Sequence, residues 1–194
     1  MLDTVRRGLD CIIKMCVCQL AMTMFGTMLA LATRQNNTLL LAASFLSIFL
    51  YLFVIYIHVW ELGASDRIKV DGGRLERKPL TGLVLSLIAN SINILLAIGR
   101  TIGYFFYDIS NNTPLWAGEL FGITNALARL IQGMYTGIIQ QFSPADFPSY
   151  TRPDIFFYII IPAILISTFA YWMGLNNKRI LALVGIDISR NSKK

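Results

Sequence analysis

The run Thr38-Leu-Leu-Leu-Ala-Ala-Ser-Phe-Leu-Ser-Ile-Phe-Leu-Tyr-Leu-Phe-Val-Ile-Tyr-Ile-His-Val-Trp60 decides the fold, because it contains no Asp, Glu, Lys or Arg. Further apolar blocks lie at residues 9–33, 80–100 and 155–175. Each block reaches the length of about 20 mostly apolar residues that a helix needs to cross about 30 Å of hydrocarbon. The sequence therefore predicts an all-α, polytopic membrane protein with four transmembrane helices.

The overall composition places the chain in the same class. Of its 194 residues, 55% are hydrophobic and only 14% are charged, which is too apolar for an ordinary soluble domain. The length suits one helical membrane domain over residues 1–194. The net charge of +6 comes from basic residues that flank the apolar blocks. We therefore expect contact with the lipid bilayer and with anionic lipid headgroups, and no nucleic-acid partner.

The distribution of Lys and Arg predicts the orientation of the chain. Cytoplasmic segments are enriched in these residues, so the N-terminal segment, the loop at residues 61–79 and the C-terminal tail are expected inside. Their cations are Arg6, Arg7, Lys14, Arg67, Lys69, Arg74, Arg77, Lys78, Lys178, Arg179, Arg190, Lys193 and Lys194. With four spans, both termini are cytoplasmic and the protein is a multi-pass component of the cell membrane.

The first apolar block has two interpretations. Arg6 and Arg7 precede a run that ends in Ala30-Leu-Ala32, a small-x-small pattern found at signal-peptide cleavage sites. The run from Met15 to Ala32 is longer than the usual signal-peptide core of about 7 to 15 residues. We therefore interpret the block as a retained first span rather than a cleaved signal peptide.

Residues 115–141 depart from the pattern of the other blocks. The segment is long enough to span, but it carries the polar side chains Glu119, Asn125, Arg129, Gln132, Thr136 and Gln140. One continuous helix would place the last five of these within an arc of about 80°, apart from the apolar residues. The segment is thus either an amphipathic or re-entrant helix or a fifth transmembrane helix. We favour four spans, because a fifth would leave the basic tail outside.

The polar residues within the apolar blocks suggest a candidate site. Asn90 and Asn93 lie one turn apart, and intramembrane Asn and Arg are costly unless they face water or a partner. In the structural interpretation they make interhelical hydrogen bonds, and the stripe of residues 115–141 faces extracytoplasmic water. In the functional interpretation they surround a polar-solute site. Its residues would be Asn90, Asn93, Asn125, Arg129 and Gln132.

Two local features complete the expected topology. The turn Asp71-Gly-Gly73 lies between alternating polar and apolar residues, which predicts a short hairpin over residues 67–77 within the cytoplasmic loop. Arg100 comes at the outer end of its block, where we expect its side chain to snorkel toward the headgroups.

No catalytic, cofactor or metal site is predicted. Cys11, Cys16 and Cys18 lie together in the first block and His58 is the one histidine, so the usual zinc and metalloprotease patterns do not occur. Three function classes remain. The first is a non-catalytic membrane component or accessory subunit with a membrane-protein partner or a second copy of the chain. The second is a small transporter or channel component, and the third is a membrane enzyme using Glu119, Asp154 or His58.

Several segments carry a family resemblance. They are Trp60-Glu-Leu-Gly-Ala-Ser-Asp-Arg-Ile-Lys69, Gly73-Arg74, Pro79-Leu-Thr-Gly82, and Tyr171-Trp-Met-Gly-Leu175 with Lys178-Arg179. Together these segments resemble uncharacterised small integral membrane proteins of Gram-positive bacteria. The resemblance implies a bacterial cytoplasmic membrane, and it brings no activity, ligand or site residue to this chain.

Overall fold

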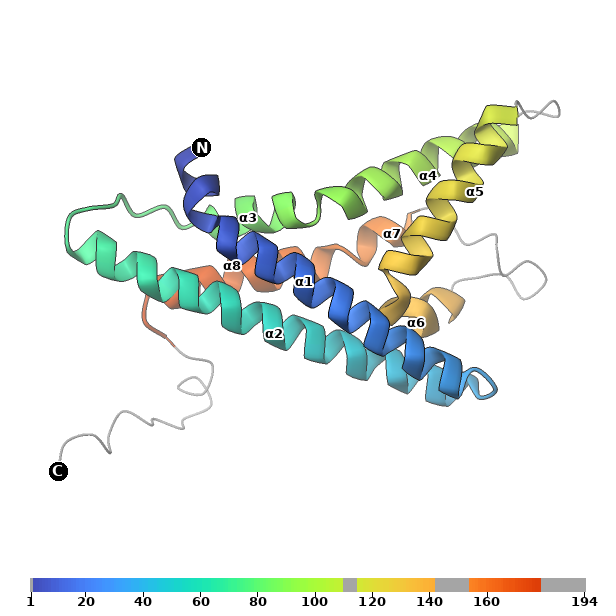
Figure 1. Ribbon diagram of the computed structural model, residues 1–194, viewed down its shortest axis with the longest axis horizontal. Helices are drawn as coiled ribbons and strands as arrows, with labels where there is room; N and C mark the ends of the chain where they lie inside the picture. Colours follow the sequence, from blue (N-terminus) through green and yellow to red (C-terminus); the bar gives the residue numbers. More distant parts are fainter. Residues whose placement is uncertain (1, 110–114, 142–153, 179–194) are drawn as a thin grey trace.

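The computed structural model describes residues 2–109, 115–141 and 154–178. Within these ranges every regular element is a helix (Figure 1). Three helical stretches are long and apolar enough to cross a membrane, and a bent pair of helices brings the number to four if the pair is counted as one span. The all-α class predicted from the sequence is therefore confirmed, with three to four candidate membrane spans.

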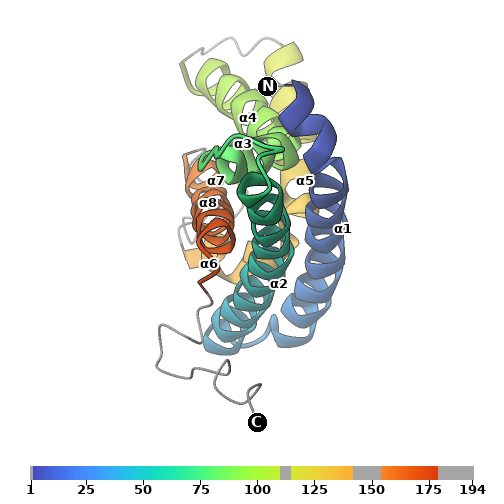
Figure 2. The ribbon, with the colours of Figure 1, turned by 90° about the vertical axis from the view of Figure 1, so that its left-hand side faces the viewer.

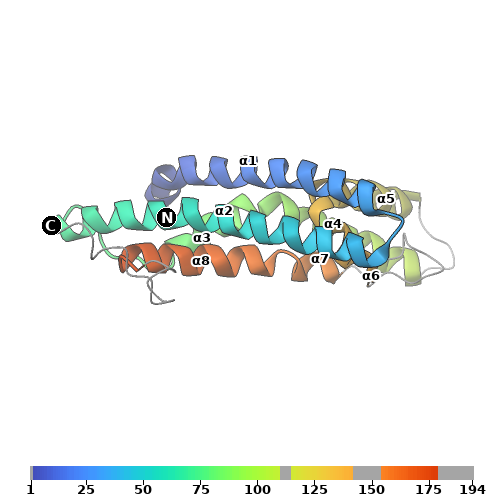
Figure 3. The same cartoon turned by 90° about the horizontal axis from the view of Figure 1, so that it is seen from below.

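The first two helices, α1 (Leu2–Thr33) and α2 (Asn37–Asp71), form a long antiparallel hairpin. The turn between them is stabilised by Asn36, whose side-chain oxygen accepts hydrogen bonds from the backbone N–H groups of Thr38 and Leu39 at 3.0 and 3.3 Å. Such an N-cap satisfies donors that have no partner within the helix. Helices α1, α2 and α8 (Ile161–Leu175) then lie side by side (Figures 2 and 3).

Helix α2 continues to Asp71, beyond the span expected to end at Trp60, and the prediction of a hairpin over residues 67–77 is wrong. Arg67 pairs with Asp71 one turn later at 3.3 Å, which suits a helix. The two glycines then end the helix in a Schellman motif. Gly73 has a φ of +68°, its N–H donates to Val70 O, and Arg74 N–H donates to Lys69 O.

The third apolar block is broken into α3 (Thr81–Ala89) and α4 (Ser91–Ile109), which are bent by 57°. The break falls at Asn90, whose side-chain N–H donates to Ser86 O at 3.0 Å. A polar side chain that bonds to the preceding turn of its own helix commonly bends it. Helix α3 contacts α1 and α8, and α4 contacts α5.

Residues 115–141 form three successive helices instead of one. Helix α5 (Leu115–Ile131) packs along α4, the short helix η1 (Gly133–Tyr135) meets α1, and α6 (Thr136–Gln141) packs against α2. Gly137 N–H donates to Ser44 Oγ at 2.8 Å, and the side chain of Gln140 reaches Asn37 at 3.5 Å. The chain therefore reverses inside the bundle, and α6 ends beside the α1–α2 turn (Figure 1).

The last apolar block forms α7 (Ile155–Tyr158) and α8, which together make one helical stretch, because Ile159 and Ile160 between them keep helical backbone angles. Pro162 lies in the first turn of α8, where its missing N–H costs no helical hydrogen bond. At its other end α8 is fixed to α2. Tyr171 Oη donates to the buried carboxylate of Asp66 at 3.0 Å, and Trp60 Nε1 donates to Lys178 O at 2.7 Å.

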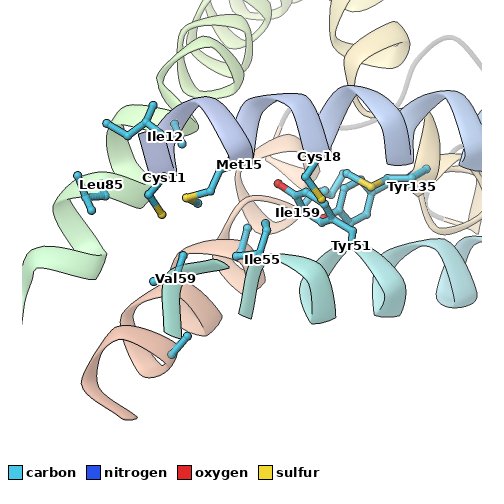
Figure 4. Close-up of a cluster of buried hydrophobic side chains, with 14 of the residues drawn as sticks. Cys11, Ile12, Met15, Cys18, Tyr51, Ile55, Val59, Leu85, Tyr135 and Ile159 are labelled. Atoms are coloured by element: carbon cyan, nitrogen blue, oxygen red, sulfur yellow. The ribbon is translucent and has the colours of Figure 1, made fainter. Parts of the chain in front are cut away.

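The core runs between α1, α2, α3 and α8 and continues to residues of α4, α5, η1, α6 and α7. Cys11, Met15, Ile55 and Leu85 fill its inner part (Figure 4). Many large apolar side chains instead point outward, and Leu31, Phe49 and Leu95 are each about two-thirds exposed or more. A surface of this kind suits lipid rather than water.

Candidate functional site

Two helix breaks meet at one small cavity, which we call the central cavity. They are the α3–α4 break at Asn90 and the α5–η1 break at Gln132, and the first turns of the helical stretch Ile155–Leu175 close the cavity with Ile159 and Ile160. The cavity has a volume of about 10 Å³, which is room for about one water molecule. Its walls are Gln19, Tyr51, Asn90, Asn93, Gln132, Met134, Tyr135, Ile159, Ile160 and Ala163.

The central cavity lies deep in the bundle. Gln19 precedes the end of α1 at Thr33 by about 21 Å of helix rise, and Tyr51 follows the start of α2 at Asn37 by about the same distance. The side chains of Tyr51, Tyr135 and Ile159 converge beside Cys18 (Figure 4). These four residues belong to the buried core, so the polar groups of the cavity are surrounded by apolar packing.

A chain of amide hydrogen bonds orients the two asparagines. Asn90 Nδ2 donates to Ser86 O at 3.0 Å, and Asn93 Nδ2 donates to Asn90 Oδ1 at 3.1 Å. Because a backbone carbonyl can only accept, Asn90 must present its NH2 group to Ser86 and its oxygen to Asn93. Asn93 Oδ1 is thus left at the end of the chain, and it has no donor among the described residues.

Gln132 brings a second acceptor to the same place. Its side chain is 2% exposed, and its Oε1 also lacks a donor within the described ranges. Gln132 directly follows the end of α5. A contact with α1 stabilises this helix end, since Thr23 Oγ1 donates to Ile131 O at 2.7 Å. Gly133 allows this contact, because a Cβ there would overlap the methyl group of Thr27. A buried acceptor without a donor costs about 1–3 kcal/mol, so the pair of oxygens favours an electropositive occupant.

The five residues proposed from the sequence fall into two groups. Asn90, Asn93 and Gln132 line the central cavity. Asn125 and Arg129 are half-buried on α5, where Arg129 Nε donates to Asn125 Oδ1 at 3.3 Å, and neither lines the cavity. The 80° arc assumed one continuous helix, whereas α5 ends before Gln132 and the chain then turns.

The other polar walls of the cavity were not predicted from the sequence, although Gln19 interrupts the first apolar run. Tyr51 and Tyr135 lie in apolar surroundings and are 2% and 5% exposed. A tyrosine in an apolar run can face lipid, pack in the core or line a binding site, and only the folded structure distinguishes these three positions.

Arg100 is buried, and the prediction that it snorkels to the headgroups is wrong. Its side chain is 0% exposed, and its guanidinium lies 4.0 Å from the ring centre of Phe156 and 5.5 Å from that of Phe121. Gly103 lets α5 come close enough to cover it, since a Cβ there would lie 2.8 Å from Phe121 N. Arg100 follows Asn93 by two helical turns and therefore continues the same buried face of α4.

An apolar groove adjoins the central cavity. It has a volume of about 570 Å³ between α2, α6 and α7, and Phe45, Ile48 and Leu52 form one wall. Asp154 is the charged residue in its lining. Tyr135 and Ile159 line both the groove and the central cavity, so these two side chains separate them.

Neither a metal-ligand cluster in the described part of the chain nor a known relative assigns a function to this site. Among the described residues, no three His, Cys, Asp or Glu side chains are grouped so that they could hold a metal ion. Searches against protein-family models, curated proteins and solved structures find no match to this chain.

Proposed function

We propose that this protein is a small transporter or channel component that binds a polar solute or ion in the central cavity. The observation that carries the proposal is the meeting of two helix breaks around two buried amide oxygens that have no donor among the described residues. Irregular backbone at membrane depth is tolerated where it is buried in protein or lines a polar cavity. Discontinuous helices also form the substrate and ion sites of many secondary transporters.

The proposal includes a topology with four spans and a re-entrant segment. The spans are α1, α2, the bent pair α3–α4, and α7 with α8. The segment 115–141 enters from the outer side, reaches the central cavity at Gln132, and returns to the same side as α6. The contact between Gln140 and Asn37 supports this path, because it ties α6 to the α1–α2 turn.

The orientation follows from the positive-inside rule. Both termini and the turn after α2 are cytoplasmic, and the α1–α2 turn is external. Lys and Arg side chains of the inner segments then contact anionic headgroups of a bacterial cytoplasmic membrane.

The structure corresponds to a closed state in this proposal. The central cavity holds about one water-sized occupant and is separated from the apolar groove by Tyr135 and Ile159. Access requires these two side chains, or the helix breaks beside them, to move. Such motions of loops and gates occur on the microsecond to millisecond timescale in many proteins.

A cysteine-accessibility experiment tests the proposal. The native Cys11, Cys16 and Cys18 are replaced by Ala, Gln132→Cys is introduced, and membrane vesicles are treated with a small charged thiol reagent. We expect labelling of Gln132→Cys, whereas the matched variant Leu130→Cys, on the exposed apolar side of α5, stays unlabelled. If Gln132→Cys reacts only after denaturation, no aqueous path reaches the cavity and the proposal fails.

A second candidate function is an accessory membrane subunit without transport activity. This function is favoured by the face of α5 that carries Gly118 and Gly122. A Cβ added at either glycine would have no atom within 4 Å. Small residues spaced by four on a membrane helix often receive a second helix. Purification in mild detergent, followed by mass measurement of the intact complex, tests this function. A monomer without a stoichiometric partner would count against it.

A further inference from the structure

We infer that the central cavity is a binding site for one dehydrated monovalent cation of about the size of Na⁺. The inference rests on the proposed function and deepens it, since it names the chemical class of the occupant. Three properties of the cavity carry it: the orientation of the amide oxygens, the absence of carboxylates from the described walls, and the size of the space.

The amide oxygens form an acceptor-rich wall. The hydrogen-bond chain from Ser86 through Asn90 fixes Asn93 with its oxygen unpaired, and Gln132 Oε1 is unpaired as well. Both residues line the cavity and are more than nine-tenths buried. An anion would meet two partial negative charges there, whereas a cation would be coordinated by both oxygens.

The chemistry of the walls selects a monovalent cation. Amide and hydroxyl oxygens are hard ligands, which suit alkali and alkaline-earth ions better than transition metals. Ca²⁺ and Mg²⁺ sites normally include carboxylates, and none of the described residues around this cavity carries one. Gln19, Tyr51 and Tyr135 also line the cavity, and each has a side-chain oxygen that can act as a ligand. Neutral oxygen cages of this kind can replace the hydration shell of an alkali ion.

The size of the cavity and the positive charge of Arg100 set the expected affinity for the cation. The cavity admits about one water-sized particle, so a hydrated ion is too large and the cation must shed its water. Arg100 lies on the same buried face of α4, about 10 Å along the helix from Asn93, and its charge weakens cation binding. We therefore expect half-saturation in the millimolar range, which is low affinity.

The test uses the purified full-length protein in detergent. Thermal unfolding is followed in NaCl, KCl, LiCl and choline chloride at one constant ionic strength. A ligand that binds only the folded state raises the melting temperature in a saturable manner. We expect such a rise with Na⁺ relative to choline. Equal melting temperatures in all four salts would mean that the cavity holds water only, and would overturn the inference.

Matched variants assign the effect to the cavity. Asn93→Leu and Gln132→Met each remove one oxygen at similar volume, and each is expected to raise the half-saturating Na⁺ concentration about tenfold or more. Asn125→Leu makes the same change outside the cavity and should leave the half-saturating Na⁺ concentration unchanged. Gln132→Glu retains an oxygen and adds a charge, so it should lower the half-saturating concentration at alkaline pH. A Na⁺ effect that survives both removals would place the ion elsewhere.

The two proposals can fail separately. If Gln132→Cys is labelled from water but no cation stabilises the protein, the solute site stands and its occupant is not an alkali ion. If Na⁺ stabilises the protein but Gln132→Cys is never labelled, the cation is a fixed structural element and the transport function falls.

Discussion

The close contact between α2 and α8 leads to a prediction whose size can be worked from the structure. Gly63 and Gly174 face each other where the two helices meet. A Cβ on Gly174 would lie 2.8 Å from Ala64 N and 2.9 Å from Gly63 Cα, and closer still to Trp60 O. These are backbone atoms, so no side-chain rotation relieves the overlap. The variant Gly174→Ala must therefore push the two helices apart.

The expected loss follows from three contributions. Overpacking of a well-packed contact costs about 1–3 kcal/mol. Separation of the helices also weakens the bond between Tyr171 and Asp66, and a hydrogen bond of this kind contributes about 1 kcal/mol or more. The better helix propensity of Ala offsets up to about 1 kcal/mol. The net change is a destabilisation of about 1–3 kcal/mol.

The assay is unfolding of the purified protein by SDS titration in mixed micelles, followed by tryptophan fluorescence. Trp60 and Trp172 lie on the two helices that separate and report the change directly. Gly122→Ala is the matched control, because an added Cβ there meets no atom within 4 Å. The reasoning is refuted if Gly174→Ala is as stable as Gly122→Ala.

Three further predictions concern single side chains. Arg100→Lys keeps the charge but loses the planar contact with Phe156, so the free energy of unfolding should fall by about 1–2 kcal/mol in the same titration. Asn36→Ala removes the N-cap of α2 and should cost about 0.5–2 kcal/mol, while Asn36→Asp should cost less. Tyr135→Ala removes part of the wall between groove and central cavity, so labelling of Gln132→Cys should become faster; an unchanged rate would exclude Tyr135 as the barrier.

The candidate membrane helices could be predicted from the sequence, because the transfer of a helix into lipid depends on composition over about 20 residues. The blocks at residues 38–60 and 155–175 contain no Asp, Glu, Lys or Arg, and the structure forms helices there. Gly82, Ser86 and Asn90, which follow one another at four-residue spacing, are all buried. Pattern alone identifies such a face, since four-residue spacing puts its members on one side of a helix.

The helix breaks were not predictable in the same way. Asn90 lies in an apolar block without Gly or Pro beside it, and its bend arises from a bond to Ser86 O that only the folded helix offers. Gln132 left the expected arc because Gly133 ends α5 against α1, and this depends on a residue, Thr27, far away in the sequence. The burial of Arg100 likewise depends on rings from two other helices.

The attachment of α8 to α2 constrains how the molecule can rearrange. At its C-terminal end α8 is tied by the Gly63–Gly174 approach, by the bond of Tyr171 to Asp66, and by that of Trp60 to the chain after α8. Toward its N-terminal end the same helical stretch reaches Ile159 and Ile160, which line the central cavity. A stiff rod tied at one end swings about that end, so its other end travels farthest. The pivot is therefore at the Gly63–Gly174 contact, and the largest displacement falls on the wall of the central cavity.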